Sequence, residues 1–313
     1  MLKKVIKIIA HLGANLYSLE RLIEQSGKHI VLPFYHAVSD ENPVHIKNLY
    51  EPRSVSAFEK DLDFLLAHYE SISLEGLMAI NRGEKELKGN YFHLTFDDGL
   101  SEFYDVVVPI LKEKNIHATV FLNSDFIDNT QLFFRFKASI LFEKLKDDAL
   151  LNFSYKDDEK LDEIALKHGV DFDVYLKEQQ PYLTTKQINE LIDEGFTFGA
   201  HSKNHPLYKE LGLEEQIIQT EESVAVVKSK FDLSYQVFSF PFTDDQVTMA
   251  FFDGLKNKID LTFGCAGLKE DTAQNHFQRI AMETNKTGKQ IIKGEYLYYL
   301  MKAKFDKHKI FRQ

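Results

Sequence analysis

The stretch that most constrains the fold is Tyr91–Gly99, in which aromatic and β-branched residues run directly into two aspartates and a glycine. Residues 91–96 have the composition of a buried strand, and Asp97-Asp98-Gly99 is typical of the turn at its carboxyl end. Ligands of α/β proteins gather where strands end, so this position suits a functional site. Adjacent side chains of a strand point in different directions, so one aspartate can bind a metal while the other faces substrate or water. A plain turn, with an aspartate capping the next helix and the glycine at positive φ, explains the same residues without chemistry.

A second strand ending with metal-ligand side chains follows much later in the chain. Residues 185–194 have the spacing of an amphipathic helix, residues 196–200 form a short apolar run, and His201 and His205 come next. Two histidines at positions i and i+4 share one face of a helical turn or tight loop, although Pro206 also permits a loop without chemistry. Two imidazoles and one carboxylate form a three-ligand catalytic site that leaves a position open for water. The two strand endings, in this order, favour a metal-dependent enzyme.

Thr95–Gly99 and His201–Pro206 together resemble the first two motifs of the polysaccharide deacetylases, the NodB-homology proteins or family-four carbohydrate esterases. The resemblance spans roughly residues 31–280. It implies an α/β fold, a distorted (β/α)7-type barrel, and the hydrolysis of an N-acetyl group on an amino sugar. Strands that alternate with helices along the chain predict the same fold class. The family's opening strand, first helix and next strand are resembled by residues 32–39, 56–65 and 117–122.

The resemblance also implies a role for each motif residue. Asp98, His201 and His205 are the implied ligands of one divalent metal, and Asp97 is the implied general base that activates a metal-bound water. Zinc is the expected metal, and cobalt, nickel or iron suit the same ligands. The third motif of the family implies that the backbone N–H of Phe242 helps to hold the oxyanion.

The later motifs depart from the family pattern. An arginine that usually orients the catalytic aspartate is absent, and its position is Ser239. Arg279 is a candidate to supply the missing positive charge, or it forms a structural salt bridge. No motif assigns the general acid, and the candidates are His36 and His276. His36 ends the strand predicted over residues 30–35, which the resemblance places beside the metal, where it either lines the pocket or is a buried structural histidine.

Composition limits the partners of the chain. The formal net charge is -10, which argues against a nucleic-acid partner. Over the average surface it would also repel acidic glycans or an anionic membrane, though not at a local patch. The chain has a single cysteine, Cys265, which excludes an intrachain disulfide and fits a reducing compartment. Cys265 lies in an apolar stretch, and we expect it in the core.

The first 29 residues are predicted to form an amphipathic helix. Apolar residues recur at helical spacing from Leu2 to Leu19, whereas Lys7 and His11 interrupt the apolar run that a signal peptide needs. The helix either packs on the domain or makes peripheral contact with a membrane or partner. No stretch is long enough to predict a transmembrane segment. We expect a cytoplasmic protein.

The remaining chain divides into a barrel and a closing segment. We expect the deacetylase barrel over residues 30–284, with a helical insertion at about 123–183, because strands and helices stop alternating there. Residues 285–313 are predicted to form a C-terminal helix and a basic tail. Long insertions at strand ends often face substrate, so the insertion is a candidate to influence which saccharide binds.

The expected function is therefore the metal-dependent removal of N-acetyl groups from an amino-sugar-containing glycan or saccharide precursor. Without an export signal, a cytoplasmic saccharide intermediate is the expected substrate. Two alternatives stay open. The missing third-motif arginine and general acid would also suit a catalytically impaired carbohydrate-binding relative. The same aspartate and histidine set would suit a metal-dependent hydrolase of another C–N bond, such as a formamide.

Overall fold

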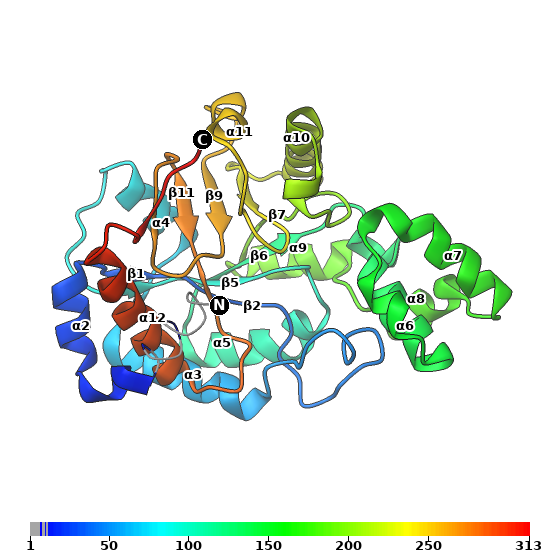
Figure 1. The fold of residues 1–313 in the computed structure, drawn as a ribbon, viewed down its shortest axis with the longest axis horizontal. Coiled ribbons are helices and arrows are strands. Elements are labelled where there is room, and N and C mark those ends of the chain that lie inside the picture. The colour runs from blue at the N-terminus through cyan, green and yellow to red at the C-terminus, as the bar shows by residue number, and fades with distance from the viewer. Residues whose placement is uncertain (1–6, 8–9, 11) are drawn as a thin grey trace.

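The computed structural model of the chain describes residues 7, 10 and 12–313 and contains one large parallel sheet flanked by helices (Figure 1). The sheet has eight strands in the order β11-β9-β8-β7-β6-β5-β2-β12, and every pairing in it is parallel. The predicted α/β class is therefore confirmed. Its strands are β2 (Pro33–Tyr35), β5 (Leu94–Phe96), β6 (Ala118–Leu122), β7 (Thr197–Ala200), β8 (Val237–Ser239), β9 (Leu261–Gly264), β11 (His276–Gln278) and β12 (Ile280–Ala281).

One segment of the chain joins the two edges of this sheet. β11 and β12 are consecutive pieces separated only by Arg279. β11 pairs with β9 at one edge, and β12 pairs with β2 at the other. The sheet thus curls into a nearly closed barrel, whose eight strands come from seven segments of the chain, which confirms the predicted distorted barrel. The closure places Arg279 at the point where the two edges meet.

Two of the predicted strands are each split into two shorter strands that belong to different sheets. β1 (Ile30–Val31), β4 (Tyr91–Phe92) and β3 (Glu70–Ser71) form a separate parallel sheet in the order β1-β4-β3. The strands predicted over residues 30–35 and 91–96 therefore break at Leu32 and His93. The buried ring of His93 bonds to the Ile72 carbonyl and the Thr119 hydroxyl, which fixes the break.

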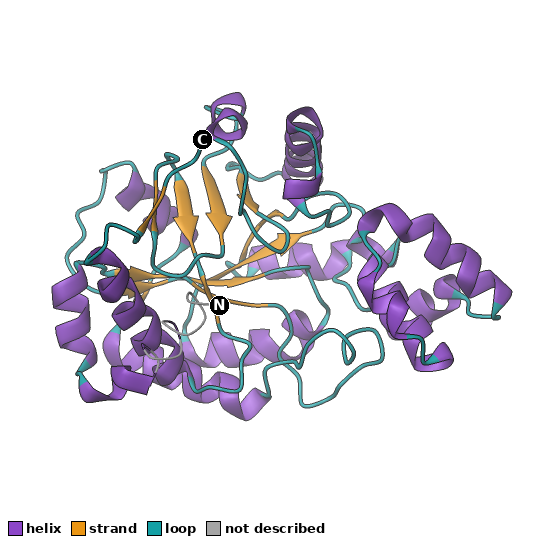
Figure 2. Cartoon of the chain, in the orientation of Figure 1, coloured by secondary structure: helices purple, strands orange, loops and turns teal. Residues whose placement is uncertain are grey.

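Helices pack on the outside of the barrel, as Figure 2 shows. A helix over residues 103–114 begins with a π-helical turn at Phe103–Val107 and continues as α5, and Pro109 lies in the first turn of α5. Ser54 caps α3 by accepting a bond from the Ala57 N–H. These outer helices are α3 (Val55–His68), α4 (Leu74–Asn81), α5 (Val108–Lys114), α9 (Thr185–Asp193), α10 (Leu213–Lys230) and α11 (Met249–Gly254).

The predicted insertion consists of helices with a core of their own. α6 (Phe134–Leu145), α7 (Asp158–Lys167) and α8 (Phe172–Gln179) lie together at one end of the molecule (Figure 1). Their buried side chains form a second apolar cluster, which also includes Ala37 and Leu100 from the loops after β2 and β5. The insertion therefore packs against two strand-end loops of the barrel. Short 3-10 turns occur at Ile127–Asn129, Asp148–Asn152, Tyr155–Asp157 and Tyr208–Glu210.

Residues 1–29 do not form one continuous helix in the part that the structure describes. A 3-10 turn, Ala14–Leu16, ends at Tyr17, and α2 (Leu19–Ser26) starts anew because the Ser18 side chain caps it. Leu16 is 85% exposed, so it does not share a buried stripe with Leu19. The predicted helical positions of residues 2–6, 8 and 9 lie outside the described residues.

The C-terminal segment is more ordered than a basic tail. α12 (Gly288–Ala303) packs against α2 and α3. β13 (Lys309–Ile310) then pairs with β10 (Glu270–Asp271), and the Arg312 side chain is 2% exposed. Among the described residues, no helix combines the length and apolar character needed to cross a bilayer.

Candidate metal and catalytic site

The turn after β5 separates the side chains of two adjacent aspartates. Asp97 and Asp98 are both buried, and Asp98 and Gly99 adopt positive φ values of 71° and 63°. A Cβ atom on Gly99 would lie 2.7 Å from Cδ2 of Leu122, so this turn requires glycine for its conformation and for space. As predicted, the two aspartates meet different partners: Asp98 faces histidines and Asp97 faces an arginine.

Asp98, His201 and His205 come together at the carboxyl ends of β5 and β7. Asp98 Oδ1 lies 3.6 Å from His201 Nε2 and 3.2 Å from His205 Nε2. One ligand atom from each of the three residues lies within 4.8 Å of the other two. These three atoms are buried and have no hydrogen-bond partner. Buried polar atoms are rarely left unpaired, so this trio fits a bound divalent cation.

Hydrogen bonds to neighbouring groups position His201 and His205 for metal binding. His201 Nδ1 donates to the Ser239 carbonyl at 2.9 Å, which leaves a lone pair on Nε2. Burial lowers the pKa of His201 to about 4, so the ring is neutral at physiological pH. The His205 N–H donates to the Ser202 hydroxyl at 3.0 Å, and both residues have positive φ, so the histidines share a tight loop and not a helical turn.

Asp98 is ionised in this setting. Burial alone would raise the pKa of the Asp98 carboxyl, but His205 and then His36 outweigh it, and the pKa falls well below its usual range. A carboxylate and the neutral imidazole of His201 are therefore available together near pH 7.

Arg279 supplies the positive charge that the third motif lacks. Its Nη1 donates to Asp97 Oδ1 at 2.8 Å and its Nη2 to Oδ2 at 2.7 Å, a bidentate pair in which both side chains are buried. Arg279 also donates to the Thr95 and Ser239 hydroxyls, so the serine at the usual arginine position accepts a bond from the substitute. Burial alone would raise the pKa of Asp97, but Arg279 outweighs it and lowers the pKa, so Asp97 is ionised.

His36 follows β2 and forms a pair with Glu283. His36 Nδ1 lies 2.5 Å from Glu283 Oε2, and Glu283 Oε1 accepts bonds from the backbone N–H groups of His36 and Ala37. Burial alone would lower the pKa of His36, but Glu283, with smaller contributions from Asp98 and Asp97, raises it to about 10. The raised pKa favours the protonated imidazolium at neutral pH. The His36 side chain is 29% exposed, so it is not a buried structural histidine.

Phe242 lies on the loop after β8, beside the trio. Its φ is 56°, and its N–H makes no hydrogen bond to another described residue. Its ring centre is 4.4 Å from that of His205. Cys265 Sγ donates to the Phe242 carbonyl at 3.3 Å. Cys265 is therefore a partly exposed contact of this loop, and the prediction that it belongs to the core is wrong.

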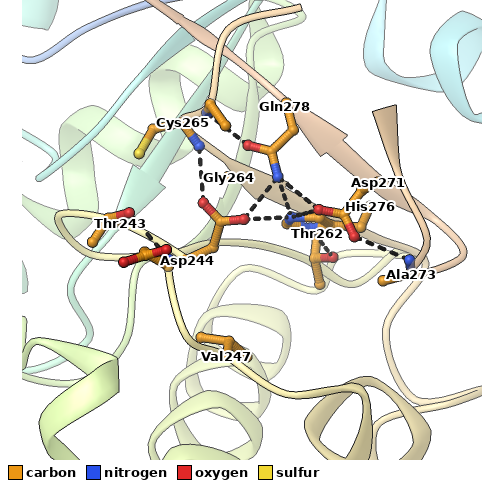
Figure 3. Close-up of polar contacts among 12 residues, drawn as sticks. Thr243, Asp244, Val247, Thr262, Gly264, Cys265, Asp271, Ala273, His276 and Gln278 are labelled. Carbon is orange, nitrogen blue, oxygen red and sulfur yellow. Dashed lines mark hydrogen bonds and ion pairs between the residues drawn. The ribbon is translucent and has the colours of Figure 1, made fainter. Parts of the chain in front are cut away.

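His276 belongs to a different cluster, shown in Figure 3. Its Nδ1 lies 2.8 Å from the Thr262 hydroxyl, and its Nε2 lies 3.1 Å from Asp244 Oδ2. The Arg312 guanidinium ion-pairs with Asp244 and Asp271 in this cluster. Both ring nitrogens of His276 are thus engaged, which removes it as a candidate general acid. The cluster has metal-binding residue types, but Arg312 already forms ion pairs with both of its carboxylates.

Sequence reasoning missed several polar side chains around the trio. Glu283 follows β12, and Asn123 follows β6 and donates to the His201 carbonyl. Both could have been found in the sequence as polar residues at or near the end of a predicted strand. Tyr50 and Arg135 come from a loop and from the insertion, where the sequence carries no comparable signal.

The fold resembles several solved structures at low sequence identity. IcaB from Ammonifex degensii is 16% identical with a TM-score of 0.60, covering 86% of this chain and 98% of that one. The Streptococcus pyogenes deacetylase PplD, in complex with acetate, is 17% identical with a TM-score of 0.58, covering 85% and 97%. A de-N-acetylase from Aggregatibacter actinomycetemcomitans is 16% identical with a TM-score of 0.57, covering 82% and 96%. These similarities establish the fold.

Sequence comparison establishes the family. No curated protein matches the chain. A family model described as polysaccharide deacetylase matches residues 84–252, more than half of the 313 residues, and this range contains both aspartates, both histidines and Phe242. The chain belongs to the polysaccharide deacetylase family.

Proposed function

We propose that this chain is a metal-dependent hydrolase that removes N-acetyl groups from an amino-sugar-containing saccharide. The observation that carries the proposal is the buried trio Asp98, His201 and His205, whose ligand atoms lack partners beside an ionised Asp97. An amide carbonyl is a poor electrophile and water is a poor nucleophile, so hydrolysis needs both to be activated.

The trio would hold one divalent cation, and its two imidazoles and one carboxylate suit zinc, with cobalt, nickel or iron as alternatives. When bound, such a cation polarises the acetamide carbonyl and lowers the pKa of water. The Nδ1–H of His201 donates to Ser239, which orients the ring for this task.

Asp97 is the general base in this mechanism. Its carboxylate takes a proton from the attacking water, and the bidentate Arg279 holds its orientation. The lowered pKa of Asp97 keeps it ionised across the neutral range, and the ionised form is the one that can accept a proton.

His36 and Phe242 complete the set. His36, held in its protonated form by Glu283, donates a proton to the departing amine nitrogen. The Phe242 N–H, which makes no hydrogen bond to another described residue, donates to the oxyanion that forms on the acetyl group. The general acid that the motifs leave unassigned is thus His36.

The substrate class is supported by the family and by the printed descriptions of the neighbours. A deacetylase in complex with acetate and a de-N-acetylase share the fold of this chain. An N-acetylated saccharide is accordingly the proposed substrate, with acetate as a product.

The test is acetate release from a panel of N-acetylated saccharides, with chelated protein reloaded with zinc, cobalt or nickel. Asp97→Asn should reduce kcat by about a hundredfold or more while the protein still binds metal. Asp232→Asn, at an exposed aspartate, is the matched control and should keep full activity. Undiminished acetate release from Asp97→Asn would refute the proposed mechanism.

The structure bears differently on the two alternative functions. The hypothesis of a catalytically impaired relative depends on a missing arginine and a missing general acid, and the Arg279–Asp97 and His36–Glu283 pairs support the active enzyme instead. A hydrolase of another C–N bond stays testable in the same assay, because formamides added to the panel would release formate.

We also propose that the protein acts in the cytoplasm on a saccharide intermediate. The single cysteine suits a reducing compartment. Cell fractionation tests this, and a processed, exported form of the chain would contradict it.

A further inference from the structure

Arg135 is a cation without a carboxylate beside the candidate site. It lies in the first turn of α6, in the insertion, and is partly buried. Among the described residues it makes no ion pair or hydrogen bond, and its contact is with the Phe242 ring, whose centre lies 5.8 Å from the guanidinium carbon. Burial lowers the pKa of Arg135, yet an arginine stays protonated in proteins. A partly desolvated guanidinium without an anion is costly, so this position calls for a ligand.

The Phe242 ring connects Arg135 to the metal trio. The Phe242 ring contacts the Arg135 guanidinium. The centre of the same ring lies 4.4 Å from the ring centre of His205. Phe242 is 38% exposed, so part of the ring faces solvent beside the trio. A saccharide whose acetamide reaches the trio would therefore pass over Phe242 and bring its next substituent to Arg135.

Tyr50 adds a second unpaired polar group to the same space. Its hydroxyl is buried and has no hydrogen-bond partner. Its ring lies 5.5 Å from that of His36 and packs against the apolar cluster of the insertion, which contributes Arg135. Tyr50 thus lies beside the proposed proton donor and against the insertion, with an O–H free to donate.

The acidic groups near Tyr50 do not compete for Arg135. Asp98 belongs to the metal trio, and Glu283 is paired with His36. Glu102 is the third, and burial raises the pKa of its carboxyl, which favours the neutral form. The chain has a net charge of -10, so carboxylates are abundant elsewhere on it, and yet none of those in the described residues pairs with Arg135.

We propose that Arg135 and Tyr50 form an anion subsite, and that the preferred substrate carries a phosphate or carboxylate group next to its N-acetylated sugar. This inference rests on the proposed deacetylase function and specifies its substrate class. Arg135 would pair with the anionic oxygens, Tyr50 would donate a hydrogen bond, and Phe242 would pack against the sugar between them. The helical insertion would then select the substrate, because it contributes Arg135.

The test compares three substrates that differ in one group: the N-acetylglucosamine tetramer, the tetramer with one 6-phosphate, and the tetramer with one C6 carboxylate. The expected result is a higher kcat/KM for an anionic tetramer, through a lower KM. Arg135→Gln should reduce this preference about tenfold to a hundredfold, the loss expected for one charge-assisted bond. Arg135→Lys should retain part of it, and Tyr50→Phe should reduce it less than Arg135→Gln does.

Arg82→Gln is the matched control, since Arg82 is an exposed arginine paired with Glu84. It should keep the preference. The two anionic tetramers distinguish phosphate from carboxylate as the natural group. Equal loss of activity on all three substrates in Arg135→Gln would mean that Arg135 only supports the Phe242 loop, and would overturn the proposal, as would a wild type that prefers the neutral tetramer.

A binding measurement separates this proposal from the proposed function. If no saccharide yields acetate with any metal, the deacetylase assignment fails. Calorimetric titration of the metal-loaded protein with the phosphorylated and neutral tetramers still decides the subsite. Tighter binding of the phosphorylated tetramer that Arg135→Gln abolishes would support it, and equal binding of both would refute it.

Discussion

At the residue scale, the decisive contact is the buried pair of Arg279 and Asp97. The two residues are 182 positions apart, and the guanidinium takes the place of the arginine that the family pattern expects at the position of Ser239. Because the pair is almost fully buried, neither partner can lose the other without leaving a charge uncompensated. A change in this contact is therefore expected to affect both the candidate catalytic site and the stability of the barrel.

Arg279→Gln is expected to lower kcat for acetate release about a hundredfold, because Asp97 loses the orientation that it needs. It should also lower the free energy of unfolding by about 3–5 kcal/mol. Steady-state kinetics and urea unfolding measure the two effects. Arg279→Lys keeps a charge without the bidentate geometry, so it should recover more stability than activity. An Arg279→Gln enzyme with unchanged kcat and intact metal content would contradict the orienting role.

The Glu283 carboxylate sets the pH range over which His36 can donate a proton. Since His36 must be protonated to act, activity should fall as the pH rises through its pKa, which Glu283 raises to about 10. Glu283→Gln should move this alkaline limb of kcat/KM to lower pH, by about one to three pH units. A pH profile of wild type and variant measures the displacement, and an unmoved limb would exclude His36 as the acid.

The same pair contributes to stability with a defined sign. The folded-state pKa of His36 is raised above the unfolded value of about 6.5, so this stability is fully present below pH 6.5 and is lost as the pH rises through about 10.

At the scale of elements, the turns after the strands carry the site. Gly99 is needed both for its positive φ and because Leu122 lies close to where a Cβ would be. The loop after β8 is also fixed by a contact with another part of the chain. Arg312, in the C-terminal tail, donates to the carbonyls of Asp244 and Val247 in this loop. Strands thus deliver the chemical groups, and loop contacts orient them.

Gly99→Ala should destabilise the protein by about 1–3 kcal/mol and weaken metal binding, since it strains the turn that carries Asp98. Gly83→Ala is the matched control, because Gly83 has a φ of 72° but no atom within 4 Å of the added Cβ. The difference between the two variants in urea unfolding measures the steric cost alone. Equal costs would show that the contact with Leu122 relaxes freely.

Arg312→Ala should lower the free energy of unfolding by about 3 kcal/mol or more, because the buried Asp244 and Asp271 lose their counter-charge. Lys309→Ala, at a half-exposed position in the same tail, should cost less than about 1 kcal/mol. Chemical denaturation of both variants tests the comparison. Similar small costs for the two would mean that the tail does not lock this cluster.

At the scale of the whole molecule, one barrel core and one insertion core meet at the site. The barrel contributes the trio and Asp97, and the insertion contributes Phe133, whose ring centre lies 4.5 Å from that of His205. Metal binding should therefore stabilise the fold as a whole, because the trio joins turns from different strands.

Loading the chelated protein with zinc should raise Tm, since a ligand that binds only the native state adds about 2.7 kcal/mol at a concentration 100 times its Kd. Thermal unfolding with and without metal measures this. His205→Ala should abolish the increase, whereas His168→Ala, on the outer insertion, should retain it. A Tm that zinc does not change in wild type would argue against metal binding by the trio.

The sequence by itself predicted the alternation of strands and helices and the three candidate metal ligands Asp98, His201 and His205. Alternating strands and helices, the Asp97-Asp98-Gly99 turn, and the spacing of His201 and His205 are local patterns, and parallel strands bring their carboxyl ends to one edge whatever the connections. The helical character of the insertion was also predictable, because Phe133, Phe136 and their neighbours repeat at helical spacing. The division of residues 1–29 was not, since the Ser18 cap outweighed a continuous apolar pattern.

Only the tertiary structure decided which distant side chains complete the site. Arg279 reaches Asp97 because the segment from β11 to β12 closes the barrel, and Glu283 reaches His36 across the same closure, 247 positions along the chain. Cys265 likewise meets the Phe242 carbonyl through strand pairing, and not through its apolar neighbours in the sequence. Such contacts depend on sheet order and register, and these are set by packing over the whole barrel, so no local pattern of residues encodes them.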